Sequence, residues 1–81
     1  MLKTKYEVPR EKLLATFDAL KGRWPEARVN TLDGLRLDGP NWWLHVRGSN
    51  TEPVVRVIAE APTEEQTREL CDAAAAVVTS V

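Results

Sequence analysis

The sequence predicts an α+β fold, in which two helices pack on one face of an antiparallel sheet of about four strands. The expected order is strand, helix, three strands, helix. Apolar residues recur at helical spacing in two stretches, one toward each end of the chain. Between them lie three short β-prone runs separated by turn-forming residues. With 81 residues, the chain is expected to form one domain, residues 1–81.

The first elements expected are an edge strand over Lys3–Val8 and a helix over Pro9–Lys21. Proline suits the first position of a helix, because the N–H that it lacks would have no partner there. Gly22 is a natural helix stop. The apolar residues that recur at helical spacing in this stretch are Leu13, Leu14, Phe17 and Leu20.

The middle of the chain predicts three strands, over Gly34–Leu37, Trp42–Arg47 and Val54–Glu60. Asp38–Asn41 supplies four turn-forming residues in a row, which indicates a hairpin between the first two strands. The last helix begins near Thr63, where a capping box with Gln66 is expected. Its buried stripe is predicted to contain Thr67, Leu70, Cys71, Ala74, Val77, Val78 and Val81.

Side-chain alternation along the second and third of these strands predicts which residues face the helices. The inward set is Trp42, Leu44, Val46, Val55, Val57 and Ala59. The outward set is Trp43, His45, Arg47, Val54, Arg56, Ile58 and Glu60. Trp43 is expected to pack on the first strand or on a neighbouring domain. Arg47 and Arg56 are therefore expected on the same sheet face, beside the loop that joins the two strands.

Composition excludes several classes of function. The net charge is -1, with no run of like charge, so no broad electrostatic surface for nucleic acid or anionic membranes is expected. No apolar stretch approaches the roughly 20 residues of a membrane span, and the N-terminus lacks a signal-peptide core, so the protein is expected to be cytoplasmic. One cysteine, Cys71, and one histidine, His45, provide no metal ligand set. We interpret Cys71 as a buried hydrophobe and His45 as a surface strand residue.

The segment from Arg47 to Pro53 has the composition of a phosphate-binding loop. Arginine supplies a bidentate guanidinium fork, Ser49 and Thr51 supply hydroxyls, Asn50 an amide, and Gly48 room for close backbone approach. Glu52 and Arg56 are expected in supporting roles, Glu52 as a partner that orients an arginine or loop N–H groups. The alternative is a polar loop whose side chains satisfy their own backbone.

The contiguous string Arg47-Gly48-Ser49-Asn50-Thr51-Glu52-Pro53 resembles the C-terminal domain of the α-D-phosphohexomutases. The likeness extends to Asp33-Gly34 before the hairpin and to the Val55-Arg56-Val57 strand that follows. It covers Gly34–Val81 closely and the N-terminal third by element order. Asn50 favours the phosphomannomutase/phosphoglucomutase branch over the phosphoglucosamine mutases, which tend to have glycine there.

The resemblance implies that this loop holds the phosphate already present on a hexose phosphate, while another domain exchanges phosphate at the far end of the sugar. Arg47, Gly48, Ser49, Asn50 and Thr51 would contact that phosphate. The family's catalytic serine segment and its Asp-Gly-Asp-x-Asp-Arg magnesium motif do not occur in this sequence. No catalytic residue, cofactor or metal is therefore expected in this chain, and Mg²⁺ would be bound by another domain of the parent enzyme.

Two hypotheses of different class follow. In the first, the chain is the substrate-phosphate-binding domain of a phosphomannomutase/phosphoglucomutase, which interconverts hexose 1-phosphate and hexose 6-phosphate, and its partners are the phosphosugar and the other domains. In the second, the chain is a standalone small module that kept the fold but binds protein or nucleic acid. Trp42 and Trp43 are the residues that would stack on bases in that case.

Overall fold

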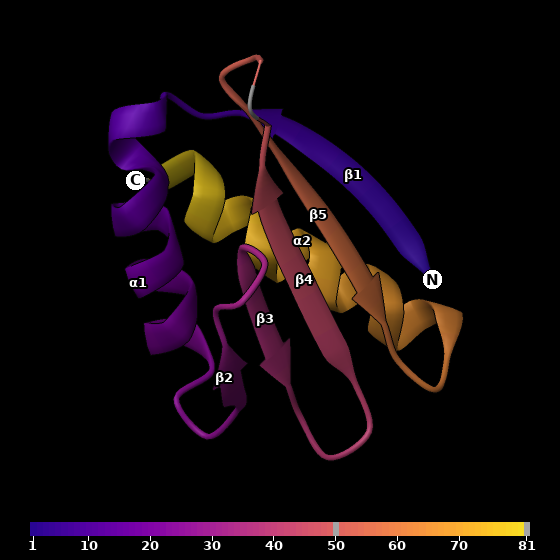
Figure 1. Ribbon diagram of the computed structural model, residues 1–81. Helices are drawn as coiled ribbons and strands as arrows, with labels where there is room; N and C mark the ends of the chain where they lie inside the picture. The colour runs from indigo at the N-terminus through magenta and orange to yellow at the C-terminus, as the bar shows by residue number, and fades with distance from the viewer. Residues whose placement is uncertain (50, 81) are drawn as a thin grey trace.

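Five antiparallel strands form the sheet, in the order β1-β5-β4-β3-β2 (Figure 1). The computed structural model describes residues 1–49 and 51–80. The strands are β1 (Leu2–Glu7), β2 (Arg28–Asn30), β3 (Leu35–Asp38), β4 (Trp43–Gly48) and β5 (Val54–Glu60). The predicted α+β class is confirmed, and β1 is an edge strand as expected. The sheet has one strand more than the four or so predicted.

The extra strand is β2, which pairs with β3 through the register Arg28↔Asp38 to Asn30↔Arg36. All three of its residues are exposed, so it contributes no side chain to the core. Because it has neither apolar alternation nor adequate length, its sequence carries no strand signal. Backbone pairing with β3 alone makes it a strand.

The first helix differs from the prediction at both ends. Arg10–Lys12 forms a 3-10 turn after Pro9, and the α-helix α1 covers Leu13–Arg23. Gly22 lies inside the helix and has a negative φ. Gly34 is the one residue with a positive φ in the described part of the chain. The helix instead ends at Arg23, and its C-cap residue Trp24 precedes Pro25. A residue before proline is disfavoured in the α conformation, so Pro25 accounts for the stop.

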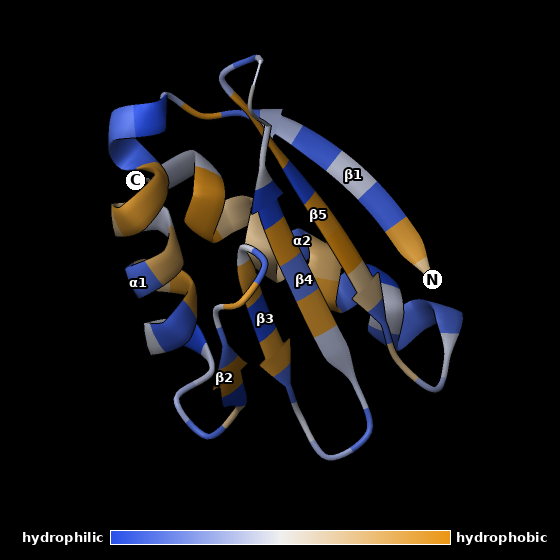
Figure 2. Ribbon diagram, viewed as in Figure 1, coloured by the Kyte–Doolittle hydropathy of each residue, from blue (hydrophilic) through white to orange (hydrophobic). Residues whose placement is uncertain are grey.

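The second helix, α2 (Glu64–Ser80), packs against β5, β1 and α1. In the view of Figure 1, α2 runs behind the sheet, and α1 lies on the side of β2 and β3. Apolar and polar bands alternate along β4 and β5 (Figure 2). The fully buried residues of the strands that face the helices are Leu35, Leu37, Leu44, Val46, Val55, Val57 and Ala59. The predicted alternation is confirmed for β4 and β5, without a bulge.

The tryptophans are placed less simply than the alternation indicated. Trp42 precedes β4, is half-buried, and packs on the core beside Trp24, with ring centroids 5.8 Å apart. Trp43 lies on β4, which β5 separates from β1. It carries the guanidinium of Arg36 over its ring at 4.8 Å and donates from Nε1 to Glu60 Oε2. Leu14 is 75% exposed, so it does not belong to the apolar stripe predicted for the first helix.

Cys71 lies in the core, 2% exposed, as predicted. Burial, with a smaller contribution from Asp72, raises the pKa of its thiol, which disfavours the reactive thiolate. The other predicted stripe residue at the end of the helix, Val81, lies outside the described residues. None of the helices in residues 1–49 and 51–80 has the length and apolarity needed to cross a membrane.

The start of α2 gives a direct test of its cap. Thr63 Oγ1 accepts a hydrogen bond from the Gln66 N–H at 3.1 Å, so the Thr63 half of the expected capping box is present. Thr63→Ala is expected to lower the free energy of unfolding by about 1 kcal/mol, because that helix N–H loses its partner. Urea denaturation measures the change. Thr79→Ala, an exposed threonine in the last turn, is the control, and an equal loss there would contradict the role of the cap.

Candidate phosphate-binding site

The predicted phosphate-binding loop connects β4 to β5 at one end of the sheet (Figure 1). Backbone hydrogen bonds close its base. Ser49 N donates to the Val54 carbonyl at 2.9 Å, and Val54 N donates to the Glu52 carbonyl at 2.8 Å. Val8 N, just after β1, donates to the Pro53 carbonyl at 2.8 Å. The loop is thus anchored to two strands and to the exit of a third. Asn50, one of the predicted phosphate contacts, lies outside the described residues.

Arg47 lies at the mouth of the loop, with its side chain 55% exposed. It sits directly opposite Arg56 in the register of β4 and β5, so the two arginines lie on the same sheet face, as the alternation predicted. The Nε of Arg47 forms an ion pair with Asp33 Oδ1 at 3.2 Å. Among residues 1–49 and 51–80 this is the one ion pair of Arg47, and it leaves the terminal Nη groups of the guanidinium for a ligand.

Asp33 is a site residue that was not among those predicted from the sequence. The turn brings it to Arg47 because β3 follows at once and pairs with β4, with Leu35 opposite Val46. His45 Nε2 lies 2.7 Å from the Asp33 carbonyl oxygen and holds the same turn. No signal in the sequence links Asp33 to Arg47. The contact depends on the register between two strands.

Gly34 allows that turn to lie against the strand. Its φ is +71°, a conformation that residues with a Cβ rarely adopt. A Cβ at Gly34 would overlap the carbonyl oxygen of Val46 and lie 3.2 Å from both Cα and Cγ of Arg47. The backbone of Gly34 therefore packs directly on the arginine that we expect to bind phosphate.

The two loop hydroxyls are close to each other. Ser49 Oγ and Thr51 Oγ1 are 3.4 Å apart, and Thr51 N donates to Ser49 Oγ at 3.3 Å. Part of the hydrogen-bonding capacity of Ser49 is thus used by the loop's own backbone, as the alternative interpretation of a plain polar loop requires. A hydroxyl has one donor and two acceptor positions, so the bond from Thr51 N occupies one acceptor position of Ser49 and does not use its donor.

A cavity of about 390 Å³ opens beside the loop. Its polar lining comes from Arg10, Asp33, Arg47 and Ser49, and its apolar wall from Leu13 and Phe17. Gly48 also lines it and approaches α1 closely, since a Cβ there would lie 3.0 Å from Leu13 Cδ2. The 3-10 turn before α1 thus contributes a second arginine, Arg10, and α1 contributes a hydrophobic side, neither of which was predicted from the sequence.

The two supporting residues are placed differently from the loop core. Glu52 accepts a backbone hydrogen bond through its carbonyl, and its role as an orienting carboxylate stays a prediction, since the carboxylate paired with Arg47 is that of Asp33. Arg56 is absent from the lining of the loop cavity. It lines another depression, on the open face of the sheet, together with Lys3 and Lys5.

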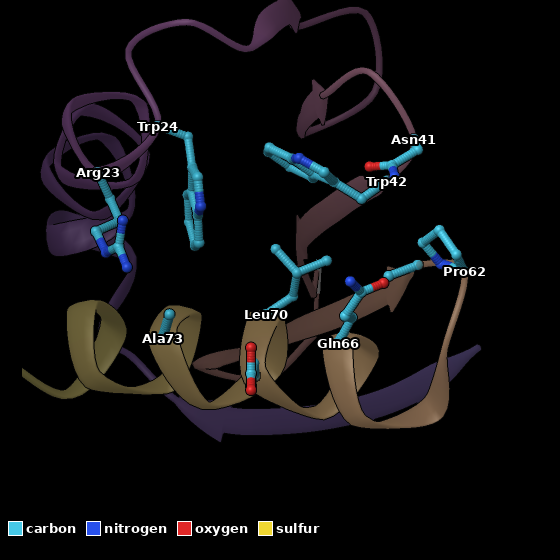
Figure 3. Close-up of a pocket in the computed structure, with 10 residues that line it drawn as sticks. Arg23, Trp24, Asn41, Trp42, Pro62, Gln66, Leu70 and Ala73 are labelled. Carbon is cyan, nitrogen blue, oxygen red and sulfur yellow. The ribbon is translucent and has the colours of Figure 1, made fainter.

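A further hollow of about 250 Å³ lies at the other end of β4, between Trp24 and Trp42 (Figure 3). Leu70 and Ala73 of α2 lie below the two rings, and Arg23 stacks on Trp24 at 5.1 Å (Figure 3). None of the predicted site residues lines it. The described residues also include no group of three or more His, Cys, Asp or Glu side chains that could hold a metal ion.

Comparison with known proteins adds to this geometry. Residues 4–77 match the family model described as "Phosphoglucomutase/phosphomannomutase, C-terminal domain". A "Probable phosphoglucosamine mutase" of Pyrococcus horikoshii is 38% identical over 64 residues, 79% of this chain and 14% of that protein. A "Phosphomannomutase/phosphoglucomutase" of Pseudomonas aeruginosa is 43% identical over 61 residues, 73% of this chain and 13% of that protein. The chain thus corresponds to about one seventh of the length of these relatives, and both kinds of mutase are among them.

Proposed function

Because the chain belongs to the family of phosphoglucomutase/phosphomannomutase C-terminal domains, we propose that it binds the phosphate group of a hexose phosphate through the loop at 47–53. The contacts would come from Arg47, Gly48, Ser49, Asn50 and Thr51, with Glu52 and Arg56 in support. In a parent phosphohexomutase of the phosphomannomutase/phosphoglucomutase branch, this contact would orient the sugar while hexose 1-phosphate and hexose 6-phosphate are interconverted.

The observation that supports the proposal most directly is that Arg47 is held by Asp33 at the wall of a cavity. Its Nε is held by Asp33 at 3.2 Å, its guanidinium lines a cavity of about 390 Å³, and Ser49 lines the same cavity. A guanidinium held at Nε presents its two Nη groups as a fork, which matches the spacing of two phosphate oxygens. Arg10 adds a second positive charge to the cavity wall. These groups suit a dianion and a sugar that packs against Leu13 and Phe17.

The proposed role is positioning, without phosphoryl transfer by this chain. Transfer of phosphate in this family would need a nucleophilic serine and Mg²⁺, which neutralises charge on the moving phosphoryl group. The described residues do not fit such a metal site, since no three acidic, histidine or cysteine side chains converge. Residues of this chain would fix the phosphate, align the sugar, and place its other end toward the remaining domains of the parent enzyme.

A titration followed by NMR tests the proposal. Addition of glucose 1-phosphate is expected to shift the backbone amides of Gly48, Ser49 and Thr51, with weak affinity, because few contacts hold the ligand on an open site. Glucose at the same concentration is the control and is expected to leave these amides in place. Unmoved loop amides at saturating phosphosugar, together with shifts caused by a single-stranded oligonucleotide, would instead support the standalone binding module.

A further inference from the structure

The open face of the sheet, opposite the helices, carries positive charge that extends from the loop to β1. Lys5 of β1 lies opposite Arg56 of β5, and Arg56 lies opposite Arg47 of β4. Three cations thus occupy adjacent positions in one row across three strands. Like charges directly opposite each other destabilise a sheet. Such a row does not stabilise the folded domain, which indicates that it has a role in binding.

No acidic partner within the described residues relieves the repulsion at two of the three positions. Arg47 is paired with Asp33, but Lys5, Arg56 and the neighbouring Lys3 form no ion pair within residues 1–49 and 51–80. All three side chains are exposed. The surrounding groups on β1 and β5 that face the same side are Glu7, Val54, Ile58 and Glu60, and Glu60 is used by Trp43 and the N-terminus.

The excess of positive charge at Lys3, Lys5 and Arg56 is not a consequence of the overall charge of the chain. Its net charge is -1, and Glu7 and Glu60 lie on the open face together with the cations. Four of the twelve acidic residues, Glu64, Glu65, Glu69 and Asp72, are exposed on α2, on the other side of the sheet. The row formed by Lys5, Arg56 and Arg47 is therefore a local concentration of positive charge, which attracts a partner of opposite charge.

Protection of a sheet edge explains only part of the cluster. Lysines on an edge strand discourage pairing with another chain, which accounts for Lys3 and Lys5 on β1. Arg56 lies on β5, which is flanked by β1 on one side and β4 on the other, so it protects no edge. Its position also lies outside the lining of the loop cavity, among Lys3, Lys5 and Ile58.

The shape and lining of this surface indicate a protein partner rather than a small anion. Lys3, Lys5 and Arg56 surround Ile58 at a shallow depression of about 340 Å³. Arginine is enriched at protein interfaces, and Ile58 offers an apolar contact beside it. Backbone N–H groups here belong to the ladder between β1 and β5, so they cannot converge on a phosphate as they do in a binding loop.

We infer that the Lys3–Lys5–Arg56 surface docks a polypeptide surface rich in carboxylates, separate from the loop that binds phosphate. The relatives extend far beyond the region that this chain matches, so their additional polypeptide is the natural source of such a surface. Carboxylates would form bidentate contacts with Arg56 and ion pairs with the two lysines, and aliphatic groups would cover Ile58. The inference does not depend on the proposed function, since Lys3, Lys5 and Ile58 have no part in the phosphate site and the two proposals share only Arg56, which the phosphate site uses in support.

The test uses a short oligoglutamate peptide as the probe, added to the labelled chain at low ionic strength. We expect it to shift the amides of Lys5, Arg56 and Ile58 and to leave those of the loop in place. In the double variant Lys3→Thr/Lys5→Thr, the affinity for the peptide is expected to fall by about fivefold or more. Threonine preserves strand propensity, and the variant should be at least as thermally stable as the parent chain, because it relieves the repulsion.

The matched control is Lys12→Gln/Arg68→Gln, which removes the same charge from exposed positions on the helices. Equal weakening of peptide binding in both double variants would show an attraction to net charge alone and would overturn the inference. Glucose 1-phosphate separates the two proposals. If it shifts the loop but the peptide does not shift β1 and β5, the docking surface fails and the phosphate site stands, and the reverse result has the opposite meaning.

Discussion

Replacing Arg47 with lysine is expected to weaken the binding of glucose 1-phosphate by about 5- to 30-fold, although the charge is retained. Lysine presents one ammonium group in place of a planar fork and cannot form the bidentate contact. A charge-assisted hydrogen bond contributes about 1.5–3 kcal/mol where it is shielded. The side chain of Arg47 is 55% exposed, so we expect about 1–2 kcal/mol here.

The measurement is an NMR titration of the loop amides at several phosphosugar concentrations, with Arg47→Lys and Arg47→Ala beside the unchanged chain. Arg47→Ala is expected to abolish the response of Gly48 and Ser49 within the accessible range. Arg68→Lys, an exposed arginine on α2, is the control for the general effect of the substitution. If Arg47→Lys binds as tightly as the unchanged chain, the guanidinium acts only as a charge and the proposed fork is wrong.

Gly34→Ala is expected to have the largest effect on stability, lowering the free energy of unfolding by about 2–4 kcal/mol. The left-handed conformation costs a residue with a Cβ about 1–2 kcal/mol. The added methyl group would also overlap the Val46 carbonyl and press on Arg47, which forces β3 and β4 apart. A chain of this length is expected to have a total stability of about 4–12 kcal/mol, so the loss would be a large fraction of it.

Urea denaturation of Gly34→Ala and Gly22→Ala measures the difference between two glycines that receive the same methyl group. Gly22 lies inside α1, and a Cβ there meets nothing within 4 Å. Gly22→Ala is therefore expected to stabilise the protein, by about 0.5–1 kcal/mol, because alanine favours the helix. If both variants have the stability of the unchanged chain, the turn at Gly34 does not hold Arg47 in the way described.

Several features of the fold could be predicted because they depend on neighbours in the chain. The alternation of β4 and β5 has a period of two, so it placed Leu44 and Val57 inside and Arg47 and Arg56 outside without knowledge of the partner strands. The boundaries of α1 were less predictable. Glycine can end a helix but does not have to, and it was Pro25 that ended this one.

The α+β class, the exposure of the arginines and the composition of the loop can be predicted from the sequence, because each follows from local periodicity or from adjacent residues. Assembly of the sheet is needed before β2 becomes a strand, Asp33 pairs with Arg47, and Arg56 lies with Lys3 and Lys5. These contacts join segments that are distant in the chain. Their physical cause is strand register, which is established when the whole sheet assembles and cannot be predicted from the sequence of one segment.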